Sequence, residues 1–153
     1  MRYFYDTEFI EDGRTIELVS IGVVAEDGRE YYAVSTEFDP EWAGSWVRAH
    51  VLTKLPSPAS QVWRSRRQIR LDLEEFLGVD SGEQIELWAW VGAYDHVALC
   101  QLWGPMPACR RRYRVSPGNC GSCGRIAAAR GYPRGPEMPT TRWSMPVINC
   151  EGF

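Results

Sequence analysis

The segment Arg2-Tyr-Phe-Tyr-Asp-Thr-Glu-Phe-Ile10 is rich in aromatic residues and ends at an acidic Asp-Gly turn. This composition predicts a β-strand, because such side chains pack well on a pleated surface. Two further segments of the same kind follow over 15–24 and 30–38, and a second Asp-Gly pair separates them. Since Asp-Gly favours tight hairpins, the three segments predict an antiparallel meander.

The spacing of apolar residues becomes helical after Pro40 and predicts helices over 42–52 and 60–77, with Gly78 at the C-terminal cap of the second. Residues 85–91 are almost continuously apolar, which is typical of a parallel strand covered on both faces. Helical spacing returns over 92–103. This order of elements predicts an α/β domain with a mixed sheet flanked by helices.

Length and composition favour one soluble globular domain. The chain has 153 residues, of which 44% are hydrophobic and 24% charged. No apolar run approaches the roughly 20 residues of a membrane span, and the first residues lack the apolar centre of a signal peptide. We therefore expect a cytoplasmic protein without a membrane segment.

Two carboxylates, Asp6 and Glu8, stand two positions apart in the first predicted strand, so both side chains project from the same face. Burying them together is costly unless a cation compensates their charge, and oxygen ligands suit Mg²⁺ or Mn²⁺. The alternative is an edge strand with one solvated face, on which the two carboxylates have no special role.

A third carboxylate, Asp95, follows the predicted parallel strand. The loops at the carboxyl ends of strands in α/β sheets commonly gather ligands there. Its position therefore favours convergence of three carboxylates on one site.

Taken together, Tyr5-Asp-Thr-Glu-Phe9 and Glu86-Leu-Trp-Ala-Trp-Val-Gly-Ala-Tyr-Asp-His-Val-Ala-Leu99 resemble the DEDD exonuclease family of the ribonuclease-H-like fold. Residues 1–105 resemble most closely the small actinobacterial 3′→5′ exoribonucleases of the polyadenylate-specific type. The resemblance implies a ribonuclease-H-like mixed sheet and an enzyme that releases nucleoside monophosphates from RNA 3′ ends.

The same resemblance implies a role for each carboxylate. Asp6 would bridge two Mg²⁺ or Mn²⁺ ions, Glu8 would hold the ion on the side of the nucleophile, and Asp95 would support the other. Family members pair as homodimers, and they complete the site with a His-x4-Asp motif on a late helix, whose His is the general base.

This third motif is missing, because the only histidines are His50 and His96 and no Asp follows Asp95. His96 neighbours Asp95 on the predicted helix and points about 100° away from it, so we expect a surface or capping role. For His50 we expect a structural role. The enzyme should therefore be weak or inactive as written.

The chain changes character near Pro105. Residues 1–106 carry 9 Lys and Arg against 18 Asp and Glu, whereas 107–153 carry 8 Arg against 2 Glu and contain no Leu, Lys, His or Asp. We therefore divide the chain into an exonuclease core, 1–105, that is truncated at its C-terminal end, and an aberrant, poorly ordered tail, 106–153.

A translation of a GC-rich gene in the wrong frame accounts for this tail. The Met and Trp codons within Met138-Pro-Thr-Thr-Arg-Trp-Ser-Met-Pro-Val-Ile148 fix several bases, and shifting the frame back by one base permits a string that contains His-x4-Asp. The alternative is a genuine divergent tail.

Three further points of the sequence each allow a second interpretation. Cys120-Gly-Ser-Cys123 has the gap of a zinc knuckle that Cys109 and Cys150 would complete, but the outer spacings are irregular. The basic residues Arg64, Arg66, Arg67 and Arg70 either contact the RNA backbone or form a solvated face. Finally, a non-catalytic metal- or RNA-binding module would keep the three carboxylates without turnover.

Overall fold

A computed structural model describes residues 1–89 and 92–105, and the backbone of 118–119. The predictions about the tail, its zinc knuckle and its arginines lie outside the described residues, as does the end of the strand predicted over 85–91.

The described residues form one six-stranded sheet in the order β4-β3-β2-β1-β5-β6. The strands are β1 (Arg2–Glu11), β2 (Ile16–Ala25), β3 (Glu30–Ser35), β4 (Trp63–Arg64), β5 (Glu86–Ala89) and β6 (Gly118–Asn119). Strands β1, β2 and β3 pair antiparallel, whereas β5 pairs parallel with β1. The meander, the parallel strand and the α/β class are thus confirmed.

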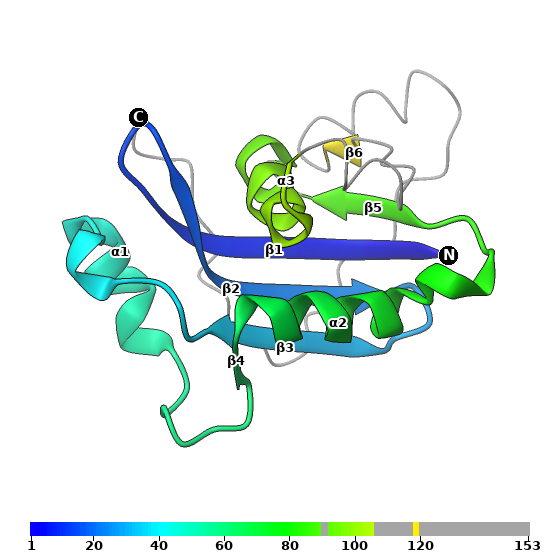
Figure 1. The fold of residues 1–153 in the computed structure, drawn as a ribbon, viewed down its shortest axis with the longest axis horizontal. Coiled ribbons are helices and arrows are strands. Elements are labelled where there is room, and N and C mark those ends of the chain that lie inside the picture. The colour runs from blue at the N-terminus through cyan, green and yellow to red at the C-terminus, as the bar shows by residue number, and fades with distance from the viewer. Residues whose placement is uncertain (90–91, 106–117, 120–153) are drawn as a thin grey trace.

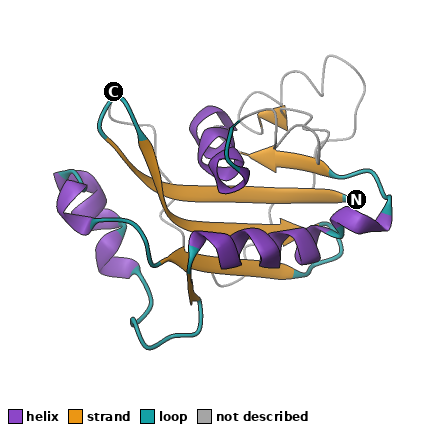
Figure 2. Cartoon of the chain, viewed as in Figure 1, coloured by secondary structure: helices purple, strands orange, loops and turns teal. Residues whose placement is uncertain are grey.

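Helices flank this sheet (Figures 1 and 2). The α-helices are α1 (Ser45–His50), α2 (Arg66–Leu77) and α3 (Gly92–Cys100), and the 3-10 turns are η1 (Pro40–Trp42), η2 (Leu52–Lys54), η3 (Val79–Ser81) and η4 (Gln101–Trp103). The helix predicted over 42–52 is therefore divided among η1, α1 and η2. Gly78 closes α2 with φ 65°, as predicted.

The start of α2 differs from the prediction, which placed it at residue 60. The helix begins at Arg66 because Ser65 is its N-cap and accepts a hydrogen bond from the Gln68 N–H at 3.2 Å. Just before it, β4 pairs parallel with β3. Trp63 and Arg64 therefore belong to the sheet, although apolar spacing alone assigned them to the helix.

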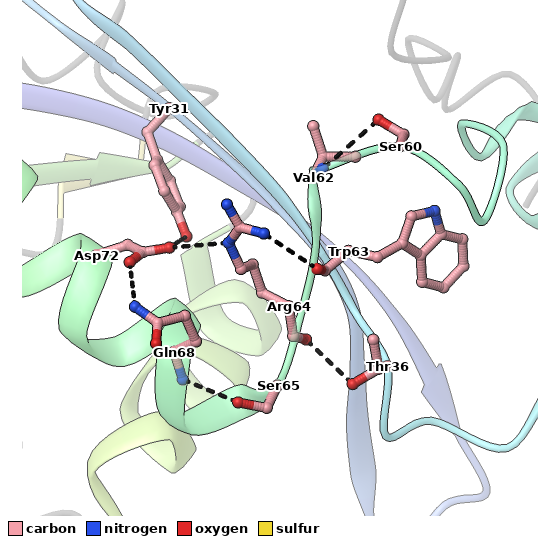
Figure 3. Close-up of polar contacts among 9 residues, drawn as sticks. All are labelled: Tyr31, Thr36, Ser60, Val62, Trp63, Arg64, Ser65, Gln68 and Asp72. Atoms are coloured by element: carbon pink, nitrogen blue, oxygen red, sulfur yellow. Dashed lines mark hydrogen bonds and ion pairs between the residues drawn. The ribbon is translucent and has the colours of Figure 1, made fainter.

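Asp72 fastens α2 to this edge of the sheet (Figure 3). Its carboxylate accepts hydrogen bonds from Gln68 Nε2 at 2.6 Å and from the Tyr31 hydroxyl at 3.4 Å, and lies 3.6 Å from Arg64 Nε. Of the four arginines considered for RNA contact, Arg64 is therefore engaged with Asp72, and Arg70 has a buried Nε. The four do not form one free basic face.

The two faces of the sheet are covered differently. Helices α2 and α3 lie over the same face, which we name the helix face (Figure 1). There, Tyr3 and Tyr5 of β1 pack in the main core with Leu73 of α2 and Leu99 of α3. The alternate residues of β1 point to the opposite face, which carries Asp6 and Glu8 and which we name the carboxylate face.

A β-bulge interrupts the pairing of β1 with β2 near the end of β1. The register shifts between Glu8 and Phe9, so Val19 of β2 is the extra residue. Leu18 joins the main core, whereas Val19 joins a second cluster with Ile10, Ala43 and Val51. Through this second cluster, α1 and η2 pack at one end of the carboxylate face.

No helix within 1–89 and 92–105 combines the length and the apolar character needed to cross a membrane.

Candidate functional site

Asp6 and Glu8 are half-buried in the middle of β1. Directly opposite them on β2 stand Gly22 and Ser20, two small residues. The strand alternation therefore places both carboxylates on one face, as predicted, and small neighbours leave space beside them.

Burial destabilises the charged form of both carboxylates. Desolvation, and then the charge of Asp95, raises the pKa of Asp6 from its usual 3.8 to about 6. Desolvation, then Asp6 and Asp95, raises the pKa of Glu8 from 4.5 to about 7, and Lys54 opposes this shift. No hydrogen-bond donor among the described residues contributes to either pKa. The two carboxylates therefore lie in surroundings that disfavour their negative charge, which Lys54 offsets only in part.

Asp95 lies in the first turn of α3 and is only 6% exposed. Its Oδ1 accepts two hydrogen bonds from Thr7, from the backbone N–H at 2.9 Å and from the hydroxyl at 2.7 Å. The three predicted residues are thus close enough to influence one another electrostatically, and Thr7 holds Asp95 beside β1.

Thr7 is a site residue that the sequence analysis missed. It stands between Asp6 and Glu8, so strand alternation turns its side chain toward the helix face. That alternation is the sequence signal that would have identified Thr7. A residue between two carboxylates that share one face of a strand projects from the opposite face, where it contacts the element that packs there.

The donor set has the chemistry of a site for a hard cation. Asp6 and Glu8 offer carboxylate oxygens, which Mg²⁺ and Mn²⁺ prefer. Within the described part of the chain, however, no three His, Cys, Asp or Glu side chains are grouped so as to hold a metal. The pair of β1 carboxylates is the part that fits, and the metal-ligand roles of Asp6, Glu8 and Asp95 stay predictions.

Both histidines have structural neighbours. His96 Nε2 lies 3.4 Å from Cys100 Sγ, and its Nδ1 lies 3.4 Å from the Tyr5 hydroxyl. The His50 ring stacks on Trp46 at 4.8 Å, and its Nδ1 lies 3.0 Å from the Trp46 carbonyl oxygen. Neither histidine takes the place of the missing general base in these contacts.

Aromatic rings border the site at the positions next to its carboxylates. Phe9, which follows Glu8, stacks on Tyr94, which precedes Asp95, with centroids 5.7 Å apart and planes within 9°. The stack joins β1 to α3 at the Asp95 end. It fixes the relative position of the two segments that carry the acidic residues.

Comparison with known proteins identifies a family. The family model described as "3'-5' exoribonuclease Rv2179c-like domain" matches residues 1–116. Two curated relatives from Mycobacterium tuberculosis are each 86% identical over 108 residues, which is 71% of this chain. They are the 3'-5' exoribonuclease MT2234.1 of strain CDC 1551 / Oshkosh and the 3'-5' exoribonuclease Rv2179c of strain ATCC 25618 / H37Rv. The chain spans 64% of the length of each.

Proposed function

The chain belongs to the Rv2179c-like 3'-5' exoribonuclease domain family, and on this basis we propose that it acts on RNA 3′ ends as a metal-dependent exoribonuclease that releases nucleoside monophosphates. The observation that carries the proposal is the half-buried pair Asp6 and Glu8. Two carboxylates with raised pKa values, to which no hydrogen-bond donor of the described residues contributes, suit a cationic cofactor better than a structural role.

When bound, two Mg²⁺ or Mn²⁺ ions would lower the pKa of the attacking water and neutralise charge on the leaving 3′ oxygen. In our proposal, Asp6 would hold both ions, Glu8 would hold the one on the side of the nucleophile, and Asp95 would support the other. The two Thr7 donors fix the position of Asp95 by holding its Oδ1.

We propose that catalysis by this polypeptide is impaired. Its sequence has no His-x4-Asp motif after Asp95, and the described contacts of His50 and His96 are structural. Loss of a general base alone costs about 10²–10⁴-fold in rate. The proposed division into an exonuclease core, 1–105, and a wrong-frame tail, 106–153, explains why the motif is lacking.

A cleavage assay tests the activity. We expect slow, Mg²⁺-dependent shortening of a 5′-labelled RNA with a single-stranded 3′ end, with mononucleotide products. Asp6→Asn and Glu8→Gln should abolish it, whereas Glu83→Gln, which changes an exposed carboxylate in a loop, is the matched control. Turnover equal to that of an intact family member would contradict the impairment.

Calorimetry separates the enzyme from a non-catalytic module. Mg²⁺ or RNA binding without any cleavage, even at high protein concentration, would favour the module. Even if no RNA is cleaved, loss of Mg²⁺ binding in Asp6→Asn would show that the predicted carboxylate site holds the cation.

We also propose that the protein is a homodimer, which is what its resemblance to the exoribonuclease family implies, and that it is cytoplasmic, as we expect from its sequence. Sedimentation velocity over a range of protein concentrations tests the dimer. A monomer at all concentrations would exclude it.

A further inference from the structure

Residues 42–71 form a continuous basic stretch in an otherwise acidic core. They contain six Lys and Arg residues and no Asp or Glu, whereas 1–106 as a whole carries 9 basic and 18 acidic residues. The stretch also holds three of the seven tryptophans. Such a combination of positive charge and aromatic rings is what single-stranded nucleic acid binds.

The first half of this stretch is fixed on the carboxylate face. Ile10, on the same face as Glu8, packs in the second cluster with Val51, and Leu52 and Leu55 pack against that cluster. These residues flank Lys54, the only lysine in the sequence. Its charge acts on Glu8, so η2, which carries Lys54, borders the acidic site.

Two tryptophans on this segment are exposed although the segment itself is anchored. Trp42 is 67% exposed and Trp46 is 46% exposed. The His50 ring supports Trp46 by stacking. Arg48 fixes the turn that carries Trp42 by donating hydrogen bonds to the carbonyl oxygens of Ala43 at 2.8 Å and Glu41 at 2.6 Å.

We propose that the surface formed by Trp42, Trp46, His50 and Lys54 binds the single-stranded RNA upstream of the 3′ end held at Asp6 and Glu8. Lys54 contacts the phosphate next to the acidic site, and the Trp46 ring stacks on a base further along the strand. The inference rests on the proposed function, because it takes the 3′ end to lie at the carboxylates.

Charge favours RNA over another protein copy as the occupant. An RNA strand that approaches Asp6 and Glu8 is repelled by a core of net charge −9, and Lys54 is the cation of the basic stretch whose charge acts on Glu8 and offsets this repulsion at the site. Positioned rings lose little conformational freedom when a base stacks on them, which is why preorganised aromatics make good platforms.

Fluorescence anisotropy of labelled RNA, in EDTA so that nothing is cleaved, tests the surface in the full chain. We use a single-stranded RNA of about 12 nucleotides, within the site sizes of such platforms, and a dinucleotide. Trp46→Ala should weaken binding of the longer RNA by about fivefold or more, and Trp46→Phe should retain most of it. Leu71→Ala, which alters a residue 39% exposed on α2, is the matched control.

The salt dependence separates charge from stacking. Lys54→Gln should reduce the slope of log affinity against log salt by about 0.7, the value for one single-strand phosphate contact, and Trp46→Ala should leave that slope unchanged. Every variant keeps the 8 arginines of the tail, so their contribution is the same throughout.

The outcomes distinguish this inference from the proposed function. Trp46-dependent binding without cleavage in Mg²⁺ supports the surface and contradicts the exoribonuclease. Cleavage with equal affinities for Trp46→Ala and Leu71→Ala overturns the surface. So does a change of sedimentation in Trp46→Ala with RNA affinity unchanged, because it assigns the tryptophans to an interface between copies.

Discussion

The Thr7 hydroxyl and backbone N–H both donate to the same oxygen of Asp95, at 2.7 and 2.9 Å, across 88 positions of sequence. Both residues are buried. These hydrogen bonds join the first strand of the sheet to the first turn of α3, and they hold the one acidic residue of the site that does not lie on β1.

Replacing Thr7 by Val should destabilise the protein by about 1–3 kcal/mol, because a buried carboxylate loses a donor while the shape of the side chain is kept. Thr7→Ser retains the hydroxyl and is the control. Urea unfolding monitored by circular dichroism measures the difference. Equal midpoints for the two variants would show that the hydroxyl contributes nothing.

Without metal, stability should fall as the pH rises. The folded state raises the pKa of Asp6 to about 6 and that of Glu8 to about 7, so between about pH 4 and pH 7 it binds more protons than the unfolded chain. In EDTA the melting temperature should therefore decrease as the pH rises through this window. At pH 7, Mg²⁺ should restore part of the decrease in melting temperature. The double variant Asp6→Asn, Glu8→Gln should lose both effects. A melting temperature that rises with pH over the same window in EDTA would contradict the raised pKa values of Asp6 and Glu8.

Removing the cap of α2 should cost stability without altering the site. Ser65→Ala deletes the acceptor for the Gln68 N–H and should destabilise by about 0.5–2 kcal/mol, whereas Ser65→Asp keeps an acceptor and should be close to wild type. Thermal unfolding measures both. If the Asp variant is as unstable as the Ala variant, capping is not what Ser65 supplies.

A single-base change near the codons for Met106 to Cys109 should open a frame that encodes His-x4-Asp. The restored protein should cleave RNA about 10²–10⁴-fold faster than this chain, since it regains the general base. The control is the restored protein with that motif histidine changed to Ala, which should fall back to the slow rate. Sequencing the gene is the first check, and a gene in which no such change opens the frame would refute the reading-frame hypothesis.

Local signals were enough to predict much of the fold. The apolar strands and Asp-Gly turns of the meander, the Gly78 cap and the apolar parallel strand all depend on neighbouring residues, so they are visible in the sequence. The placement of Asp6 and Glu8 on one face follows equally from the two-residue period of a strand.

Contacts between distant segments were not predictable in this way. The sequence favoured a helix from residue 60, and only pairing of β4 with β3 shows that the chain first adds a strand. Nothing local links Lys54 to Glu8, or Thr7 to Asp95, because each pair depends on how a helical segment packs on the sheet. The two-residue period of a strand is sufficient to assign Asp6 and Glu8 to one strand face. Tertiary packing alone decided what buries and surrounds them, since burial and the charges of distant residues set their pKa values.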